Sequence, residues 1–306
     1  MKILLATDGS DTARVATEFL MGFPLPPATE VLVMTVIREV LRGDELQYLN
    51  DEQRKTFGQA IQEAEAEARR LLAEETARLQ QAGLVAEGRV CKGDPAEEIV
   101  RLASDENCDL ITVGSHGLSG VKRFLLGSVS DRVFEYASCS VLIVKPPADG
   151  AASHPSIAGK NYRWRLMLAY DDSPPARRAV ELCASLPLAS RATIKAVTVM
   201  PMIRMYRQDI RQQLSWIWQQ KRQAAEKALE QIAAEVDWKG TEVQTEVIEE
   251  SNASQAILDA AEAFDSDLLV VGHKGKKAFE RFLLGSVTAR LAHHATCPVL
   301  SVRNCG

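Results

Sequence analysis

The chain has 306 residues, 46% of them hydrophobic, and a formal net charge of -5 at pH 7. This length favours two domains of about 150 residues each, and the ordinary composition argues against a protein that binds nucleic acid through charge alone. No run approaches the roughly 18 apolar residues of a membrane span, and the first apolar run meets Asp8 too early for a signal peptide. Scattered cysteines without Cys-x-x-Cys pairing indicate reduced thiols, so we expect a cytoplasmic protein.

The first half of the chain alternates short apolar runs with amphipathic segments. Strands are predicted at 2–7, 30–37, 85–91, 110–113 and 141–144, and helices at about 11–22, 53–82, 96–104 and 128–137. Short continuous apolar runs are typical of strands that are buried on both faces. Residues 39–50 are expected to form an irregular connection or a short helix. The order of elements predicts a doubly wound parallel sheet with right-handed crossovers.

Residues 146–162 are rich in Pro, Ala, Gly and Ser and lack a hydrophobic period. They are predicted to link a first domain at 1–145 to a second domain at 163–306. The second half repeats the plan, with strands at 165–170, 193–199, 241–248, 268–271 and 299–302 and helices from 173 and at about 208–236, 253–264 and 286–294. The predicted fold class is α/β, with two tandem doubly wound domains, each a five-stranded parallel sheet flanked by helices.

One motif occurs in both halves: Gly-x-x-Gly, nine residues, then Gly-Ser. The first copy consists of Gly114, Gly117, Gly127 and Ser128, and the second of Gly272, Gly275, Gly285 and Ser286. Amides in a glycine-rich turn and in the first turn of a helix point outward, and the helix dipole adds roughly half a positive charge there. The motif therefore predicts two phosphate-binding loops. The alternative, glycines that only end a strand and a serine that only caps a helix, is weakened by the identical spacing.

These features resemble the universal stress protein family in its tandem, ATP-binding form. The resemblance rests on the strand-Asp segments at 3–8 and 166–171, the valines Val36 and Val199, GDPAEEI at 93–99, and RFLLGSV at 123–129 and 281–287. It covers nearly the whole chain except the linker. It implies a Rossmann-like, adenine nucleotide α-hydrolase-like fold that holds ATP, or ADP or AMP, at the switch point of each sheet. Mg²⁺ could accompany the nucleotide.

The resemblance also implies a role for each matching position. Asp8 and Val36 would hold the edge and the wall of the adenine, while Gly114, Gly117, Gly127 and Ser128 would hold ribose and phosphates, with Val129 beside them. The matching residues of the second half are Asp171, Val199, Gly272, Gly275, Gly285, Ser286 and Val287. The basic residues of the two loops, which could offset phosphate charge or simply be solvated, are Lys122, Arg123, Lys274, Lys276, Lys277 and Arg281. No catalytic or metal-ligating residue is assigned.

The two halves differ at two places close to the expected sites. Gly93-Asp94-Pro95 of the first half is replaced by Ser251-Asn252-Ala253, and Asp8-Gly9-Ser10 by Asp171-Asp172-Ser173. The second half thus loses a glycine and a proline from one turn and gains a carboxylate in another. We therefore expect the first site to be the better occupied, although the second loop is richer in lysine.

The residues favour an adenine-nucleotide-binding stress-response or regulatory protein over an efficient enzyme. No P-loop Gly-Lys-Ser/Thr, acidic Mg²⁺ pair, Ser-His-Asp set or Cys-His set stands out. Two alternatives stay open. One is a slow ATPase or adenylyl-transfer enzyme using the same pocket. The other is a scaffold that binds a lipid or metabolite, with an apolar pocket lined by Met200, Met202, Met205, Tyr206, Trp216 and Trp218.

Partners are expected beyond the nucleotide. The family resemblance implies that the last strands, 141–144 and 299–302, pair the two domains within one chain. A homodimer and a regulatory protein partner are further expectations, whereas a nucleic acid or a membrane is not.

Overall fold

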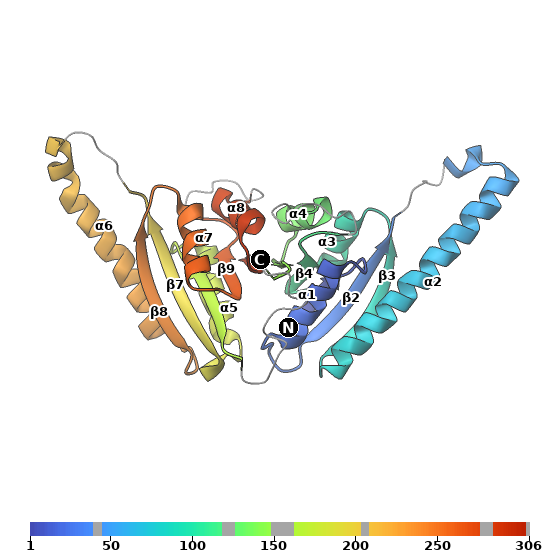
Figure 1. Ribbon diagram of the computed structural model, residues 1–306, viewed down its shortest axis with the longest axis horizontal. Coiled ribbons are helices and arrows are strands. Elements are labelled where there is room, and N and C mark those ends of the chain that lie inside the picture. The colour runs from blue at the N-terminus through green and yellow to red at the C-terminus, as the bar shows by residue number, and fades with distance from the viewer. Residues whose placement is uncertain (39–44, 118–125, 148–161, 203–207, 276–283, 304–306) are drawn as a thin grey trace. The chain divides into compact units, whose positions relative to one another are not determined.

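The chain divides into two compact units, each built around five parallel strands (Figure 1). The computed structural model describes residues 1–38, 45–117, 126–147, 162–202, 208–275 and 284–303. The first unit consists of Met1–Gly22 and Pro27–Val144, and the second of Phe23–Pro26 and Lys145–Gly306.

The first unit is a doubly wound α/β domain. Its strands are β1 (Lys2–Ala6), β2 (Glu30–Ile37), β3 (Val85–Lys92), β4 (Leu110–Gly114) and β5 (Ser140–Val144), and its helices are α1 (Asp11–Gly22), α2 (Asp51–Gln81), α3 (Pro95–Asp105) and α4 (Ser128–Tyr136). The strands are parallel and lie in the order β3-β2-β1-β4-β5. Helices α1 and α2 contact each other on one face, and α3 and α4 on the other. Strand order therefore reverses between β1 and β4.

Burial explains why the central strands read as continuous apolar runs. Ile3, Leu4 and Leu5 of β1 are all 0% exposed, because helices cover both faces of the sheet. Residues 45–48 form a short 3₁₀ helix, η1 (Glu45–Tyr48), within the segment expected to be irregular or a short helix. The predicted fold class is confirmed.

The second unit repeats this architecture. Its strands are β6 (Trp164–Ala169), β7 (Ala192–Met200), β8 (Glu242–Glu249), β9 (Leu268–Gly272) and β10 (Val299–Val302), and its helices are α5 (Pro174–Ser185), α6 (Gln208–Glu235), α7 (Ala253–Ala263) and α8 (Ser286–His294), with a 3₁₀ helix, η3 (Ala189–Arg191), before β7. The parallel order is β10-β9-β6-β7-β8. Each strand begins and ends within two residues of its prediction.

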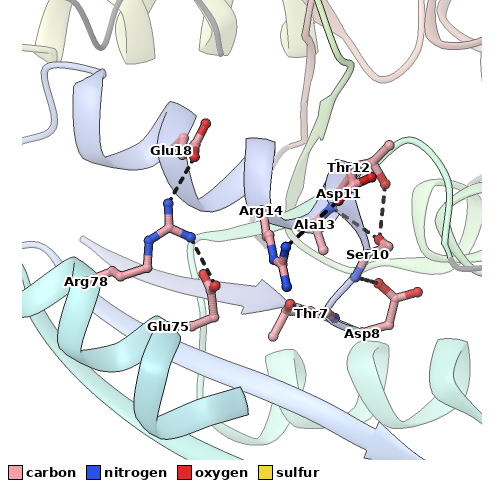
Figure 2. Close-up of polar contacts among 11 residues, drawn as sticks. Thr7, Asp8, Ser10, Asp11, Thr12, Ala13, Arg14, Glu18, Glu75 and Arg78 are labelled. Atoms are coloured by element: carbon pink, nitrogen blue, oxygen red, sulfur yellow. Dashed lines mark hydrogen bonds and ion pairs between the residues drawn. The ribbon is translucent and has the colours of Figure 1, made fainter. Parts of the chain in front are cut away.

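A polar network fixes α1 against α2 in the first unit (Figure 2). Arg78 donates to Glu18 at 3.0 Å and to Glu75 at 3.1 Å. The hydroxyl of Thr17 donates to Glu75 at 2.5 Å. The Glu75 carboxylate is almost fully buried, so its two partners offset the cost of removing it from water. The network holds in place the helix that begins beside the cavity described below.

The cysteines contribute to packing. Cys183 and Cys297 carry free thiols, and burial raises the pKa of each to about 12. Cys297 packs in the core of the second unit with Leu269 and Val299. Both thiols are therefore protonated at neutral pH and poor nucleophiles. Among the described helices, none is both long and apolar enough to cross a membrane.

Candidate functional sites

In the first unit, every residue assigned to a ligand from the sequence lines one cavity of about 500 Å³. These residues are Asp8, Val36, Gly114, Gly117, Gly127, Ser128 and Val129. The cavity lies beyond the carboxyl ends of β1, β2 and β4. Because strand order reverses between β1 and β4, this is the switch point at which open α/β sheets bind ligands.

The second unit contains the matching cavity, of about 860 Å³. Its lining includes all the corresponding residues, namely Asp171, Val199, Gly272, Gly275, Gly285, Ser286 and Val287. The structure therefore brings together, in each unit, residues that lie far apart in the sequence. Both volumes fall in the range of about 300–1,000 Å³ that is usual for small-molecule sites.

The helix at each cavity begins without a side-chain cap. Asn50, Asp94, Ser173 and Asn252 accept from first-turn amides of α2, α3, α5 and α7. By contrast, α4 follows Gly127 and α8 follows Gly285, and no described side chain caps either helix. Ser128 is the first helical residue, so it does not act as the cap. The first-turn amides and the positive end of the helix dipole are thus available to an anion in each cavity.

Two hydrogen bonds join the start of each helix to the end of the preceding strand. Ser130 Oγ donates to the carbonyl of Gly114 at 2.7 Å, and the amide of Gly127 donates to the carbonyl of Ser115 at 2.8 Å. The second unit repeats both bonds, with Thr288, Gly272, Gly285 and His273 in the corresponding places. Ser130 and Thr288 belong to the site but were missed from the sequence, where only their position two residues after Gly-Ser could have revealed them.

The first glycine of the motif is required by packing. A Cβ on Gly114 would lie 2.8 Å from the carbonyl carbon and oxygen of Thr12 in α1, and one on Gly272 would lie 2.8 Å from the amide nitrogen of Ala176 in α5. Neither position has a positive φ. The sequence analysis assigned these glycines to phosphate-binding loops, and the structure adds that the first turn of a helix packs directly on the strand end.

The second glycine lies against the carboxylate at the end of the first strand. Asp8 Oδ1 accepts from the amide of Ser10 at 3.0 Å (Figure 2), and a Cβ on Gly117 would lie 2.6 Å from Asp8 Oδ2. In the second unit Asp171 Oδ1 accepts from Ser173 at 3.1 Å, and Oδ2 would lie 2.7 Å from a Cβ on Gly275. Each glycine therefore leaves room for a carboxylate that lines the cavity.

Several lining residues differ between the cavities, and of these only Lys274 was named from the sequence as a possible phosphate contact. Met34 and Pro95 of the first cavity are replaced by Val197 and Ala253 in the second. Smaller side chains at both positions agree with the larger volume of the second cavity. Further replacements are Thr7 by Tyr170, Arg38 by Pro201, His116 by Lys274, and Ser130 by Thr288.

The additional carboxylate of the second unit is held by neighbouring side chains. Asp172 Oδ1 accepts from the hydroxyl of Tyr170 at 3.0 Å and from Arg177 Nε at 2.9 Å. Asp172 has a φ of 59°, close to the 76° of Gly9 at the same point of the first unit, so the turn is the same. Asp172 is not among the residues that line the cavity. The expectation that this carboxylate would lower the occupancy of the second site is therefore not supported.

The turn that loses its glycine and proline still caps its helix. Asn252 Oδ1 accepts from the amide of Gln255 at 3.3 Å, as Asp94 Oδ1 accepts from Glu97 at 3.1 Å in the first unit. The replacement of Asp94 by Asn252 thus preserves the cap and removes a charge. Since Gly93 and Glu250 make equivalent backbone bonds to β2 and β7, the second turn is longer by one residue, Ser251.

Several residues named from the sequence are either outside the described residues or outside the lining of the cavities. Lys122, Arg123, Lys276, Lys277, Arg281, Met205 and Tyr206 lie outside the described residues. Met200, Met202, Trp216 and Trp218 are not part of the lining of the second cavity. Met202 and Trp216 are 40% and 57% exposed. The apolar pocket imagined for a scaffold is thus not assembled by those four side chains.

Comparisons with known proteins identify relatives for both units. A family model described as the Universal stress protein family matches residues 1–145 and 164–303. Universal stress protein MJ0577 of Methanocaldococcus jannaschii is 34% identical over 154 residues, which cover 47% of this chain and 94% of that protein. Universal stress protein YxiE of Bacillus subtilis is 32% identical over 145 residues, covering 47% and 98%. The crystal structure of a universal stress protein from Archaeoglobus fulgidus shares the fold, with a TM-score of 0.68, 24% identity, and 100% and 98% coverage.

Proposed function

This chain belongs to the Universal stress protein family, and we propose on that premise that it is an adenine-nucleotide-binding regulatory protein of the stress response, with one site in each unit. The base would lie beside Asp8 or Asp171, and the phosphates at the glycine turn and the first turn of α4 or α8. The observation that carries the proposal is the uncapped helix start in each cavity, at a motif whose spacing is identical in the two units.

The groups that line each cavity suit the parts of a nucleotide. A carboxylate accepts hydrogen bonds from an exocyclic amine of a base, and free amides donate to phosphate oxygens. Val36 and Val199 offer apolar surface beside the carboxylates. We propose ATP, ADP or AMP as the resident ligand, with Mg²⁺ bound through the phosphates where they carry it. The proposal places the protein in the cytoplasm, acting through a protein partner.

The test begins with the purified protein. It is denatured, released nucleotide is identified by mass spectrometry, and ATP is titrated calorimetrically into stripped protein. We expect two equivalents for the wild type and one for each of the variants Asp8→Ala and Asp171→Ala. The matched control is Asp11→Ala, because the Asp11 side chain is fully exposed at the start of α1 and does not line the cavity.

Two results would contradict the proposed function. If stripped wild-type protein bound no adenine nucleotide, the sites would serve another ligand and the proposed function would be wrong. If the protein turned over ATP faster than about 1 s⁻¹, near the lower end of ordinary enzymes, the alternative of an ATPase or adenylyl-transfer enzyme would replace the regulatory one.

A further inference from the structure

The two sites differ in the charges at the start of their helices. In the first unit Arg132, on the second turn of α4, donates to both carboxylate oxygens of Asp94, at 3.0 and 2.9 Å, and to Glu97 at 3.1 Å. The hydrogen bond from the Glu97 amide, together with the Arg132 guanidinium, lowers the pKa of Asp94. Two carboxylates therefore engage this arginine. The cluster of Arg132, Asp94 and Glu97, which we call the rim of the cavity, carries a net negative charge.

The second unit keeps the arginine and loses both carboxylates. Arg290 occupies the position of Arg132 on α8, while Asn252 and Gln255 replace Asp94 and Glu97. Asn252 still caps α7, although the turn before it is longer by one residue, Ser251. Arg290 is exposed, and none of the described carboxylates forms an ion pair with it. The same rim therefore carries a positive charge in the second unit.

Arg290 is not among the residues that line the cavity, but helix geometry places it close to the start of α8, which does line it. Arg290 lies four residues after Ser286, on the same face of α8. Side chains on a helix lean toward its N-terminus and cover the preceding turn, which here is the uncapped first turn. Lys274, in the glycine turn, is the cation among the described residues that line the second cavity, where the first cavity has the imidazole of His116.

At the opposite end of the second cavity the charge becomes more negative than in the first cavity. Glu250 lines this cavity and occupies the place of Gly93, and Pro201 replaces Arg38 of the first cavity. Glu250 thus adds a carboxylate near the end of β8, away from Lys274 in the glycine turn and from Arg290 on α8. This separation would orient a ligand that is strongly anionic at one end only. Among the described residues that line the first cavity, the cation is Arg38, which follows β2 and does not lie in the glycine turn.

We propose that the second site selects nucleotides by the charge of their phosphate chain, taking triphosphates well ahead of monophosphates, while the first site discriminates little between them. The inference rests on the proposed nucleotide function and adds ligand selection to it. A triphosphate gains more from Arg290 and Lys274 than a monophosphate does, because it carries more negative charge and reaches farther. The larger cavity also leaves room for the longer chain, at about 860 Å³ against about 500 Å³.

The experiment measures each site separately in the full chain. Asp171→Ala leaves the first site and Asp8→Ala leaves the second, and AMP and ATP are titrated into each variant. The selectivity of a site is the ratio of its dissociation constants for AMP and ATP. We expect this ratio to be larger at the second site by about tenfold or more, the range for hydrogen bonds to charged groups. Its ATP affinity should also fall more steeply as salt is added.

Exchange of residues between the units tests the cause. In the background that keeps the second site, Arg290→Gln and Lys274→His should each lower the selectivity ratio. In the background that keeps the first site, the pair Asp94→Asn and Glu97→Gln should raise it, because the cap is retained and Arg132 is released. Arg222→Gln, an exposed arginine of α6 outside the lining, should change neither ratio.

The outcomes separate the inference from the function beneath it. Equal ratios at two sites that both bind nucleotide would overturn the inference alone, as would ratios that the exchanges leave unchanged. Absence of binding by the stripped wild type would overturn the proposed function, and the inference with it. Thermal melts of each variant show whether a lost affinity reflects a lost fold.

Discussion

Replacement of Gly114 by alanine should destabilise the first unit even in the absence of any ligand. The new Cβ would lie 2.8 Å from the carbonyl carbon and oxygen of Thr12, about 0.6 Å closer than an ordinary contact. Thr12 belongs to the first turn of α1, so the helix backbone must move to relieve the contact. Overpacking of a well-packed core typically costs about 1–3 kcal/mol. Because the new Cβ would meet the backbone of Thr12, which cannot rotate away as a side chain can, the cost should be near the upper value, about 3 kcal/mol.

The size of this effect can be measured by thermal and urea denaturation of stripped protein, followed by far-UV circular dichroism. For a domain of this size, about 3 kcal/mol corresponds to a fall in Tm of roughly 6–12 °C. Gly127→Ala is the matched control within the same motif. Its Cβ would meet no atom closer than 3.4 Å, and Gly127 has a φ of -66°, which alanine adopts readily. It should cost less than about 1 kcal/mol.

The second unit offers an independent repetition with a separate signal. Gly272→Ala would place a Cβ 2.8 Å from the amide nitrogen of Ala176, so a similar loss is expected. All four tryptophans of the chain follow residue 163, and their fluorescence therefore reports on this unit. The packing explanation would be refuted if Gly114→Ala were as stable as Gly127→Ala yet bound no nucleotide, since the glycine would then serve the ligand alone.

Gly117→Ala should leave the Tm nearly unchanged, because the new Cβ displaces the rotatable Asp8 carboxylate and no backbone atom. Calorimetry should show ATP binding at the first site weakened by about tenfold. An unchanged affinity would contradict a role for the Asp8 carboxylate. Burial, followed by nearby positive charge, lowers the pKa of His273 to about 3 from 6.5, so the unfolded chain binds the proton first as pH falls. The stabilisation by the neutral imidazole is complete above pH 6.5 and is lost as the pH falls toward 3. Urea titrations should therefore show that the free energy of unfolding of the wild type falls by about 3 kcal/mol more than that of His273→Gln between pH 7 and pH 4. An equal fall in both proteins would contradict this prediction. Glu75→Gln should cost about 1.5–3 kcal/mol in the same assay, because the buried carboxylate accepts from an arginine and a threonine. The exposed neighbour Glu74→Gln should cost almost nothing, and equal losses would show that the buried network adds little.

The fold followed from the sequence because its signals are local. Apolar runs marked the buried strands, and residues 286–294 and 299–302 form the predicted elements without any shift. The site followed for a geometric reason. Residues that end neighbouring parallel strands share one edge of the sheet, so Asp8, Val36 and Gly114 had to converge once the strand order was known.

Other features depend on contacts that no local pattern encodes. The need for glycine at 114 depends on how closely α1 approaches the strand end. The fate of Asp172 depends on Tyr170 and Arg177, which bind it and keep it out of the lining. The ion pair between Arg132 and Asp94 spans 38 positions of sequence. Each is a matter of tertiary packing and becomes visible only when the elements are placed in space.

Duplication makes the two sites unusually informative about each other. Both place the same motif on the same backbone, with the same pair of hydrogen bonds between helix start and strand end. Among the described residues, the two sites therefore differ in a few exchanged side chains, above all at the rim and in the glycine turn. Asn252 retains the cap of Asp94 while abandoning its charge, which leaves Arg290 without that acidic partner. The proposed selectivity would let one chain respond to two phosphorylation states of one nucleotide through this exchange of side chains.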